Sequence, residues 1–194
     1  MNILVAAALE KELGDHFKEE DLVFTGVGKI NAAYSLTKAI VKKRPKFVFN
    51  LGTAGSRKFS KGSVLLCTNF YQRDMNVSPL GFPIGVTPYS QNPRVLNFGV
   101  TLPGYTTHTC SSGDNFITTE DDPADCDVFD MEAYSLALVC KNEKISFICL
   151  KYITDGASET SASDWQENLE NGPTALYEAY KNIRQEIKGM EISG

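Results

Sequence analysis

Three apolar runs mark the chain at positions far apart in the sequence. They cover residues 2–9, 47–51 and 146–150, and apolar side chains follow one another in each with almost no interruption. Runs of this kind are typical of strands that are buried on both faces of a parallel sheet. The pattern therefore predicts a largely parallel sheet at the centre of the molecule.

Other segments repeat apolar residues at the spacing of helix turns. Residues 30–43 and 131–144 each place apolar side chains on one side of a predicted helix. The last stretch opens at residues 163–164 and carries Trp165 on its apolar side, but the pair Gly172-Pro173 interrupts it. We expect covering helices over the first two segments and a C-terminal helix that is broken or kinked at the third.

The middle of the chain differs from both ends. Residues 71–105 contain five prolines and several glycines among short apolar pieces, which favours long loops and irregular strands over helices. Loops of this kind over a sheet commonly form binding surfaces. Because strands and helices alternate and no composition shift marks a boundary, we expect one three-layer α/β domain over residues 1–194.

Composition and charge narrow the class of partner. The chain is 42% hydrophobic and 22% charged, as in ordinary globular proteins, and its net charge is -5. That charge disfavours a broad electrostatic contact with nucleic acid or an anionic membrane. The first apolar run is far shorter than the roughly 20 residues of a membrane span, and no basic segment precedes it. We therefore expect a cytoplasmic protein that binds a small molecule or another protein.

Cysteine and histidine usage argues against several kinds of site. The five cysteines include no CxxC pair, so reduced and mostly buried thiols are expected. Only His16 and His108 could supply an imidazole to a catalytic triad or a zinc site. The sequence implies neither a metal ion nor a cofactor.

Two glycine-containing segments could approach a ligand with their backbone. Residues 26–31 begin like a dinucleotide fingerprint, but Asn31 replaces the third glycine and no acidic residue follows at the usual distance. Residues 50–56 follow an apolar run directly, and their glycines would let backbone amides approach an anion or a sugar hydroxyl. Taken alone, an ordinary strand-to-loop turn is the simpler interpretation of that segment.

Carboxylates at the ends of apolar runs are more informative. Glu10 and Glu12 follow the first run, Asp130 and Glu132 open a predicted helix, and Asp155 ends the strand predicted over residues 146–154. Each alone is typical of a helix cap or a solvated charge. However, strand ends from separate segments meet at one edge of an α/β sheet. Carboxylates gathered there suit acid–base chemistry on a polar organic substrate.

Six motifs occur in a fixed order, at residues 7–13 (AALEKEL), 25–29 (TGVGK), 50–55 (NLGTAG), 112–117 (SGDNFI), 130–133 (DMEA) and 153–157 (ITDGA). Together they resemble the nucleoside phosphorylase superfamily, and most closely its methylthioadenosine/S-adenosylhomocysteine nucleosidase branch. A looser match covers residues 73–78 with Gly81 and Phe82. The resemblance implies a three-layer α/β/α sandwich with a central mixed, largely parallel sheet.

The resemblance implies a role for each matched carboxylate. The residue matching Glu12 holds and activates the attacking water, and the pair matching Met131 and Glu132 contacts the ribose. The residue matching Asp155 protonates, or hydrogen-bonds, N7 of the leaving purine. Cleavage of an N-ribosidic bond needs these groups, because positive charge develops on the sugar and negative charge on the base. Asp155 can donate only when protonated, which requires burial or a partner such as Thr154.

The same resemblance implies the rest of the substrate site and a dimer. Phe116 is expected to stack on the purine, with backbone groups around Ile117 reading its edge. Further substrate contacts are expected at Leu9, Thr53 and Gly55. A homodimer is the expected assembly, with the proline-rich middle segment as a candidate to close a partner's pocket.

This sequence also departs from the family pattern. It is shorter than the usual nucleosidase between residues 15 and 21 and between residues 82 and 108. Arg73 stands where the family has a histidine, and Thr53 where a serine is common. These departures leave the accepted 5′ substituent open.

The sequence therefore predicts a purine nucleosidase that hydrolyses an adenosine-type nucleoside, with methylthioadenosine or S-adenosylhomocysteine as leading substrates. A phosphorylase is the first alternative, for which Lys29, Arg57 and Arg73 could supply positive charge to phosphate. A nucleoside-binding protein of the same fold without catalytic activity is the second, since fold does not fix function.

Overall fold

The computed structural model describes residues 2–119 and 126–192, with the side chains of residues 190–192 left out. The remaining residues of the expected domain, at 1, 120–125 and 193–194, lie outside the described part. Within it, eight strands form one sheet. These strands are β1 (Ile3–Ala7), β2 (Leu22–Phe24), β3 (Phe47–Gly55), β4 (Val64–Gln72), β5 (Val95–Asn97), β6 (Thr107–Ser112), β7 (Val128–Asp130) and β8 (Ser146–Asp155).

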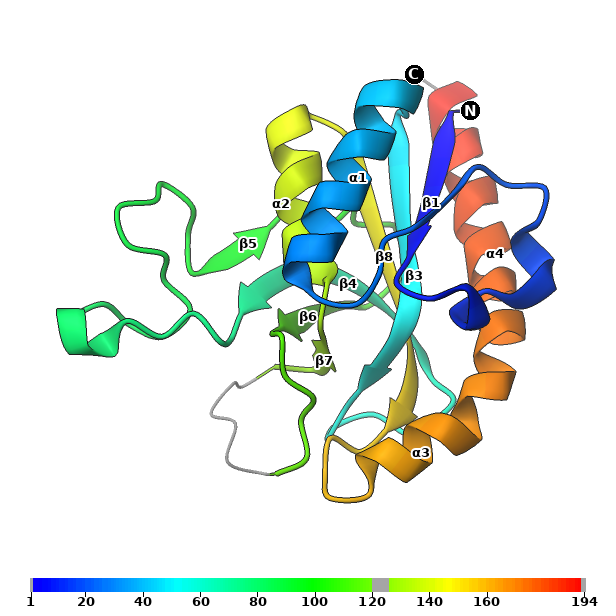
Figure 1. Ribbon diagram of the computed structural model, residues 1–194. Coiled ribbons are helices and arrows are strands. Elements are labelled where there is room, and N and C mark those ends of the chain that lie inside the picture. Colours follow the sequence, from blue (N-terminus) through cyan, green and yellow to red (C-terminus); the bar gives the residue numbers. More distant parts are fainter. Residues whose placement is uncertain (1, 120–125, 193–194) are drawn as a thin grey trace.

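Helices cover both faces of this sheet (Figure 1). The helices α1 and α2 pack against one face and α4 against the other, each burying apolar side chains. The α-helices are α1 (Lys29–Lys43), α2 (Ala133–Glu143), α3 (Ser161–Asn168) and α4 (Gly172–Ile192). Short 3₁₀ turns are η1 (Glu10–Glu12), η2 (Gly14–Phe17), η3 (Ser78–Leu80) and η4 (Leu169–Asn171).

The strands do not form the flat middle layer of a sandwich. β8 pairs with both β3 and β4, and the pairings β3–β7, β7–β6 and β6–β4 complete a closed ring. Register shifts after Ala54 in β3 and after Cys67 in β4 mark the bends that closure requires. The predicted α/β/α sandwich is corrected in this respect. Five of the eight pairings are parallel, so the mixed, largely parallel sheet is confirmed.

Local sequence explains where α1 begins and ends and which face it packs on the sheet. Its buried residues Ala32, Leu36 and Ile40 recur every four positions and form the stripe that packs on the sheet. The helix begins after Gly28, whose φ of 93° favours glycine, and ends at Arg44 in the left-handed conformation. The N-terminus of α1 lies at the carboxyl end of the sheet, because the Gly28 N–H donates to Glu132 Oε1, two residues after the end of β7.

The predicted elements are largely confirmed, with one change in extent. The first apolar run forms β1, the third forms β8 and ends at Asp155 as predicted, and the second continues further than predicted, through Gly55 in β3. Residues 50–55 are therefore part of a strand and not a strand-to-loop turn. The C-terminal helix is broken, as predicted, but the break is η4, and Gly172-Pro173 begin α4.

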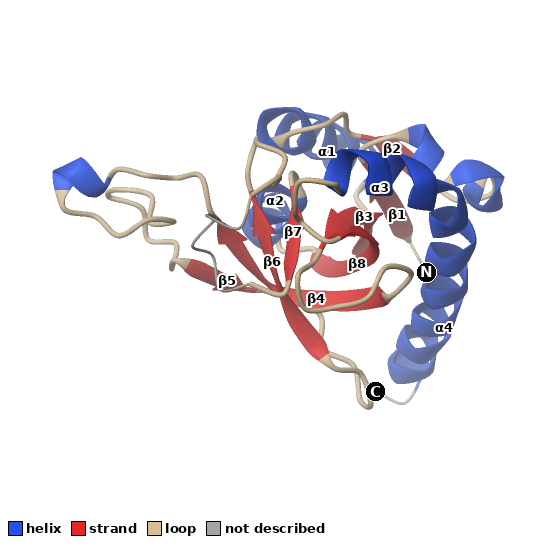
Figure 2. Ribbon diagram, turned by 90° about the horizontal axis from the view of Figure 1, so that it is seen from below, coloured by secondary structure: helices blue, strands red, loops and turns tan. Residues whose placement is uncertain are grey.

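The proline-rich middle segment forms an arm. Between β4 and β5 the chain is irregular apart from η3, and it extends away from the body of the molecule (Figure 2). This confirms the expected loops and short strands. The five cysteines are all buried thiols, as expected. None of the helices in residues 2–119 and 126–192 has the length and apolar character that a membrane span requires.

Candidate active site

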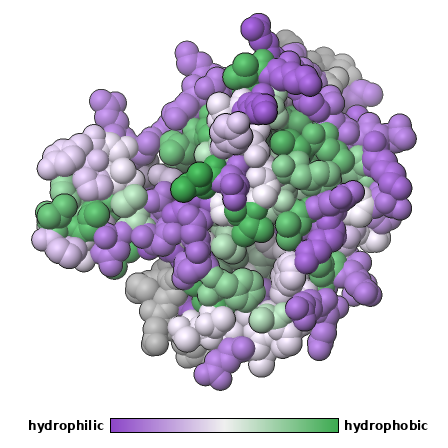
Figure 3. Space-filling view, in the orientation of Figure 1, coloured by the Kyte–Doolittle hydropathy of each residue, from purple (hydrophilic) through white to green (hydrophobic). Residues whose placement is uncertain are grey.

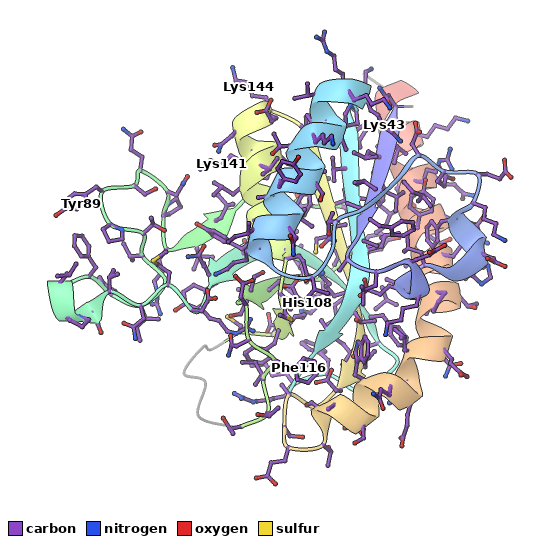
Figure 4. All side chains as sticks on the ribbon, viewed as in Figure 1. Lys43, Tyr89, His108, Phe116, Lys141 and Lys144 are labelled. Atoms are coloured by element: carbon purple, nitrogen blue, oxygen red, sulfur yellow. The ribbon has the colours of Figure 1, made fainter. Side chains whose placement is uncertain are left out.

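A pocket of about 260 Å³ opens at the carboxyl ends of β1, β3, β7 and β8. Phe116, on the loop after β6, lies near the lower ends of β3 and β8 in Figure 4. The pocket is lined by Ala8, Leu9, Glu12, Val27, Thr53, Ala54, Gly55, Arg73, Asn115, Phe116, Ile117, Phe129, Asp130, Met131, Glu132, Asp155, Ala157 and Trp165.

Glu12 is buried and held by hydrogen bonds from two segments. Its Oε1 accepts from the Thr53 N–H at 2.8 Å and from the Thr53 hydroxyl at 2.9 Å, and its Oε2 accepts from the Leu9 N–H at 2.9 Å. Gly52 makes this approach possible, because a Cβ there would lie 3.2 Å from Oε1. The carboxylate is thus fixed against β3 with one edge toward the pocket.

Asp155 ends β8 and is held by its neighbours. Its Oδ1 accepts from the Ala157 N–H at 3.0 Å, and the Thr154 hydroxyl lies 2.9 Å from its Oδ2. Gly55 leaves the room that the side chain occupies, since a Cβ there would lie 2.5 Å from Oδ1. The glycines at positions 52 and 55 therefore make room for protein carboxylates.

Glu132 is a buried carboxyl group that contacts the residue before α1. Its Oε1 accepts from the Gly28 N–H at 2.9 Å, so the glycine-rich turn binds a side chain of this protein. Burial raises the pKa of Glu132 from 4.5 to about 7, and the charge of Asp130 adds to this shift. The positive charge of Lys151 and the Gly28 hydrogen bond act in the opposite direction. Glu132 is therefore a carboxyl group that changes charge near neutral pH.

Lys151 is a buried cation that sequence reasoning missed. Its Nζ lies 2.8 Å from Asp130 Oδ2, and both side chains are almost completely buried. Burial opposes ionisation of each, but their mutual attraction lowers the pKa of Asp130 and raises that of Lys151. Asp130 also accepts from the Ala133 N–H at 2.8 Å and so binds the N-terminus of α2. The sequence signal that could have identified this cation was a single lysine within an otherwise apolar strand.

Arg73 shapes the wall that carries Phe116. Its Nη1 donates to the Ser111 and Asp130 carbonyls at 2.6 and 2.8 Å. Its Nη2 donates to the Gly113 and Asn115 carbonyls at 3.3 and 2.6 Å. The guanidinium group therefore holds the loop after β6 in place. Phe116, in the same loop, remains 45% exposed.

Trp165 is a second residue that sequence reasoning missed as part of the site. The sequence placed it on the apolar side of the C-terminal helix, whereas it lies on the separate helix α3 and lines the pocket. Its indole N–H donates to Thr53 Oγ1 at 3.0 Å. Lys11 Nζ lies 4.0 Å from the centroid of its ring. Its occurrence as the one tryptophan of the chain was the only signal.

The structure brings most of the predicted site residues to this pocket. Thr154 is fully buried behind Asp155 and is absent from the lining, and Glu10 is exposed outside it. No group of three or more metal-type side chains is placed to hold an ion in the described ranges. The predicted residues that line the pocket are Leu9, Glu12, Thr53, Gly55, Phe116, Ile117, Met131, Glu132 and Asp155.

The arrangement suits a substrate with a flat apolar part and a polar part. Phe116, Ile117 and Phe129 supply apolar surface, and Asp155 stands beside Ala157 at the same wall. Carboxyl groups from three separate segments face one small space, as the sequence predicted. Such a site can exchange protons with a substrate and stabilise positive charge on it.

The relatives found by sequence comparison share one name. The chain is 28% identical over 174 residues to the 5′-methylthioadenosine/S-adenosylhomocysteine nucleosidase of Staphylococcus epidermidis, covering 79% of this chain and 75% of the relative. It is 28% identical over 187 residues to the same-named protein of an Exiguobacterium species, covering 86% and 79%.

Solved structures show the same fold. The 5′-methylthioadenosine/S-adenosylhomocysteine nucleosidase of Helicobacter pylori, crystallised with a pyrrolidine compound, superposes with a TM-score of 0.86 at 18% identity. The match covers 95% of this chain and 97% of that one. The native futalosine hydrolase of Helicobacter pylori gives the same TM-score and identity. A sequence model described as the phosphorylase superfamily matches residues 16–184. The chain therefore belongs to the phosphorylase superfamily.

Proposed function

We propose that this protein is a purine nucleosidase that hydrolyses the N-glycosidic bond of an adenosine-type nucleoside. Methylthioadenosine and S-adenosylhomocysteine are the leading substrates, because the curated relatives carry the names of these two compounds. The observation that carries the proposal is the convergence of Glu12, Glu132 and Asp155 on one pocket with an apolar wall. Residues from separate segments thus meet where the chemistry needs them.

Glu12 is the proposed base for the attacking water. A carboxylate can accept about four hydrogen bonds, and the described residues fill two positions on Oε1 and one on Oε2. The remaining position on Oε2 is available to a water molecule. The water oxygen forms a bond to C1′ of the ribose, and one water proton passes to Glu12.

Asp155 is the proposed acid for the leaving base. As the bond between C1′ and N9 breaks, its electron pair moves onto the purine, which takes a proton at N7 from the carboxyl group of Asp155. The products are the free purine and the free sugar. Phe116 and Ile117, which line the pocket, are the proposed contacts to the purine plane, and Thr154 contacts Asp155 from behind.

Glu132 is the proposed partner of the ribose. Its ionised form can accept hydrogen bonds from sugar hydroxyls, and its attraction to the sugar increases as positive charge develops. Met131 lines the pocket beside it and supplies an apolar contact to the ring.

Phosphorolysis is disfavoured because the candidate cations are engaged elsewhere. Arg73 donates to four backbone carbonyls, and Lys29 is paired with Asp74. Arg57 lies over the Phe129 ring and donates to the Ala157 carbonyl.

The experiment is incubation with a panel of purine nucleosides, with and without phosphate. We expect free adenine and free sugar at a rate that phosphate does not change. A sugar 1-phosphate would show a phosphorylase instead, and no release from any nucleoside would leave a binding protein. Glu12→Gln and Asp155→Asn are expected to lose release while keeping nucleoside affinity within about tenfold, because each amide keeps the shape but not the proton transfer.

We further propose a cytoplasmic homodimer. Support comes from an exposed apolar stripe on α1 at Ile30, Tyr34 and Val41, and from Leu80 and Tyr89 on the arm. Hydrophobic patches appear on this face and on the arm in Figure 3, and the label in Figure 4 places Tyr89 far from the body of the molecule. Such surface is typical of protein interfaces. Sedimentation equilibrium tests the assembly, and a monomer at micromolar concentration would contradict it.

A further inference from the structure

Trp165 is connected to Glu12 through one side chain. The indole N–H of Trp165 donates to Thr53 Oγ1 at 3.0 Å, and the Thr53 hydroxyl lies 2.9 Å from Glu12 Oε1. The three groups come from α3, β3 and η1, which are distant in the sequence. They form a chain of hydrogen bonds along the wall of the pocket.

The direction of this chain is fixed by its donors. An indole N–H can only donate, so Thr53 Oγ1 must accept from Trp165. A hydroxyl group has one proton, and the neighbouring acceptor for it is Glu12 Oε1. The Thr53 N–H also donates to Oε1, so this oxygen receives two hydrogen bonds from one residue. Donation by the indole also polarises the hydroxyl and strengthens its bond to the carboxylate.

Other contacts hold the indole where it can act. Lys11 Nζ lies over its ring, 4.0 Å from the centroid, and Lys11 directly precedes Glu12 in η1. At the neighbouring position of α3, Asp164 forms an ion pair with Lys61 at 2.6 Å. α3 is therefore attached both to η1 and to the turn before β4.

We propose that Trp165 is a positioning residue that orients Glu12 through the hydroxyl group of Thr53. With Oε1 occupied by Thr53, the free position of the carboxylate is on Oε2, toward the pocket. Without the indole, the hydroxyl can rotate and Glu12 loses one of the groups that fix its plane. This inference rests on the proposed role of Glu12 as the base for water.

The test is a double-mutant cycle on Trp165 and Thr53. Trp165→Phe keeps an aromatic ring but removes the N–H, and we expect kcat to fall about tenfold with KM changed less than about twofold. In a Thr53→Val background, which removes the hydroxyl at similar volume, Trp165→Phe should cause no further fall. In a Thr53→Ser background, which keeps the hydroxyl, the fall should return. Equal falls in both backgrounds, or a change in KM alone, would show that Trp165 only shapes the pocket.

A second readout does not depend on turnover. Trp165 is the single tryptophan of the chain, so fluorescence excited at the long-wavelength edge of its absorption, where the eight tyrosines absorb little, reports on it alone. Thr53→Val should shift the emission maximum to shorter wavelength because the indole loses its acceptor, whereas Thr53→Ser should not. An identical spectrum in all three proteins would overturn the proposed contact.

These results separate this inference from the proposed function. If the wild type releases adenine and Glu12→Gln does not, but Trp165→Phe turns over like the wild type, the inference is wrong and the nucleosidase stands. If the wild type releases no purine from any nucleoside, the proposed function fails and the positioning role fails with it. Melting temperatures within about 3 °C of the wild type would confirm that each variant is folded.

Discussion

Glu132 is subject to two opposing requirements. Its carboxyl group must be ionised to attract a cationic sugar, yet it is buried close to Asp130, and together these raise its pKa from 4.5 to about 7. In the unfolded chain the group ionises near 4.5. The folded protein therefore holds a proton on Glu132 at pH values where the unfolded chain has released it.

The sign of the resulting pH effect follows from linkage. Below about pH 4.5 the folded and unfolded states both carry the proton, so the ionisation of Glu132 does not lower the free energy of unfolding. Between about pH 4.5 and 7 the unfolded state binds fewer protons, so the free energy of unfolding falls as pH rises. Above about pH 7 the full cost remains, which for this shift is on the order of 3 kcal/mol.

Glu132→Gln should remove this cost while keeping an acceptor for the Gly28 N–H. We expect the variant to be more stable than the wild type by about 3 kcal/mol at pH 8 and by less than about 1 kcal/mol at pH 5. Urea unfolding at the two pH values measures the difference. The same gain at both would show that the ionisation of Glu132 is not its source. Turnover should nevertheless fall, because the amide carries no charge.

At the scale of single residues, the sequence identified groups that carry recognisable chemistry and missed those that act by placement. Carboxylates at the ends of apolar runs pointed to Glu12, Glu132 and Asp155, and the structure places all three at one pocket. Lys151 and Trp165 gave no such signal, because a lysine in a strand and a tryptophan in a helix are ordinary until their neighbours are known. Their partners, Asp130 and Thr53, are distant in sequence.

At the scale of elements, β3 is the strand against which the site is built. Glu12 lies against Gly52 and Asp155 against Gly55, so two positions without a Cβ set how closely the two carboxylates approach the sheet. The glycines act through the space that they leave and not through backbone freedom, since neither has a positive φ.

Gly55→Ala should therefore displace Asp155. Its Cβ would lie 2.5 Å from Asp155 Oδ1, and that side chain is held by Ala157 and Thr154 and cannot simply rotate away. We expect turnover to fall by about a hundredfold or more, because small displacements of a catalytic group are costly.

Gly156→Ala is the matched control for this prediction. Within the part of the chain that the structure describes, a Cβ at that position would meet only the Ser158 hydroxyl at 3.6 Å, an ordinary contact. Steady-state rates for the two variants, measured together, test the claim. If both variants turn over equally, the close contact at Gly55 is not what places Asp155.

The elements themselves were predictable where burial gives a continuous apolar pattern. β1, the start of β3 and the start of β8 follow from such runs, and α1, α2 and the broken C-terminal helices follow from helical spacing. β6 and β7 do not, because residues 107–112 are mostly polar and β7 has three residues. The closed ring was not predictable, since it depends on β8 pairing with two strands at once and no local pattern records that.

At the scale of the whole molecule, closing the ring places charge in its interior. Lys151 on β8 is almost completely buried, and the groups that act on its charge include Asp130 on β7 and Cys110 on β6. An ion pair in such a place contributes little net stability compared with an apolar pair, but removing one partner leaves the other charge uncompensated. The pair therefore links the integrity of the ring to the carboxylates of the pocket.

Lys151→Met should lower the free energy of unfolding by about 3 to 5 kcal/mol, because it leaves the Asp130 carboxylate buried without its cation. Lys42→Met on the exposed end of α1 is the control, with an expected change within about 0.5 kcal/mol. Adding Asp130→Asn to Lys151→Met should restore part of the loss, because the uncompensated charge is then gone. Equilibrium unfolding in urea checks all four proteins, and one shared transition is also what the predicted single domain requires. If Lys151→Met costs no more than Lys42→Met, the buried pair does not stabilise the ring.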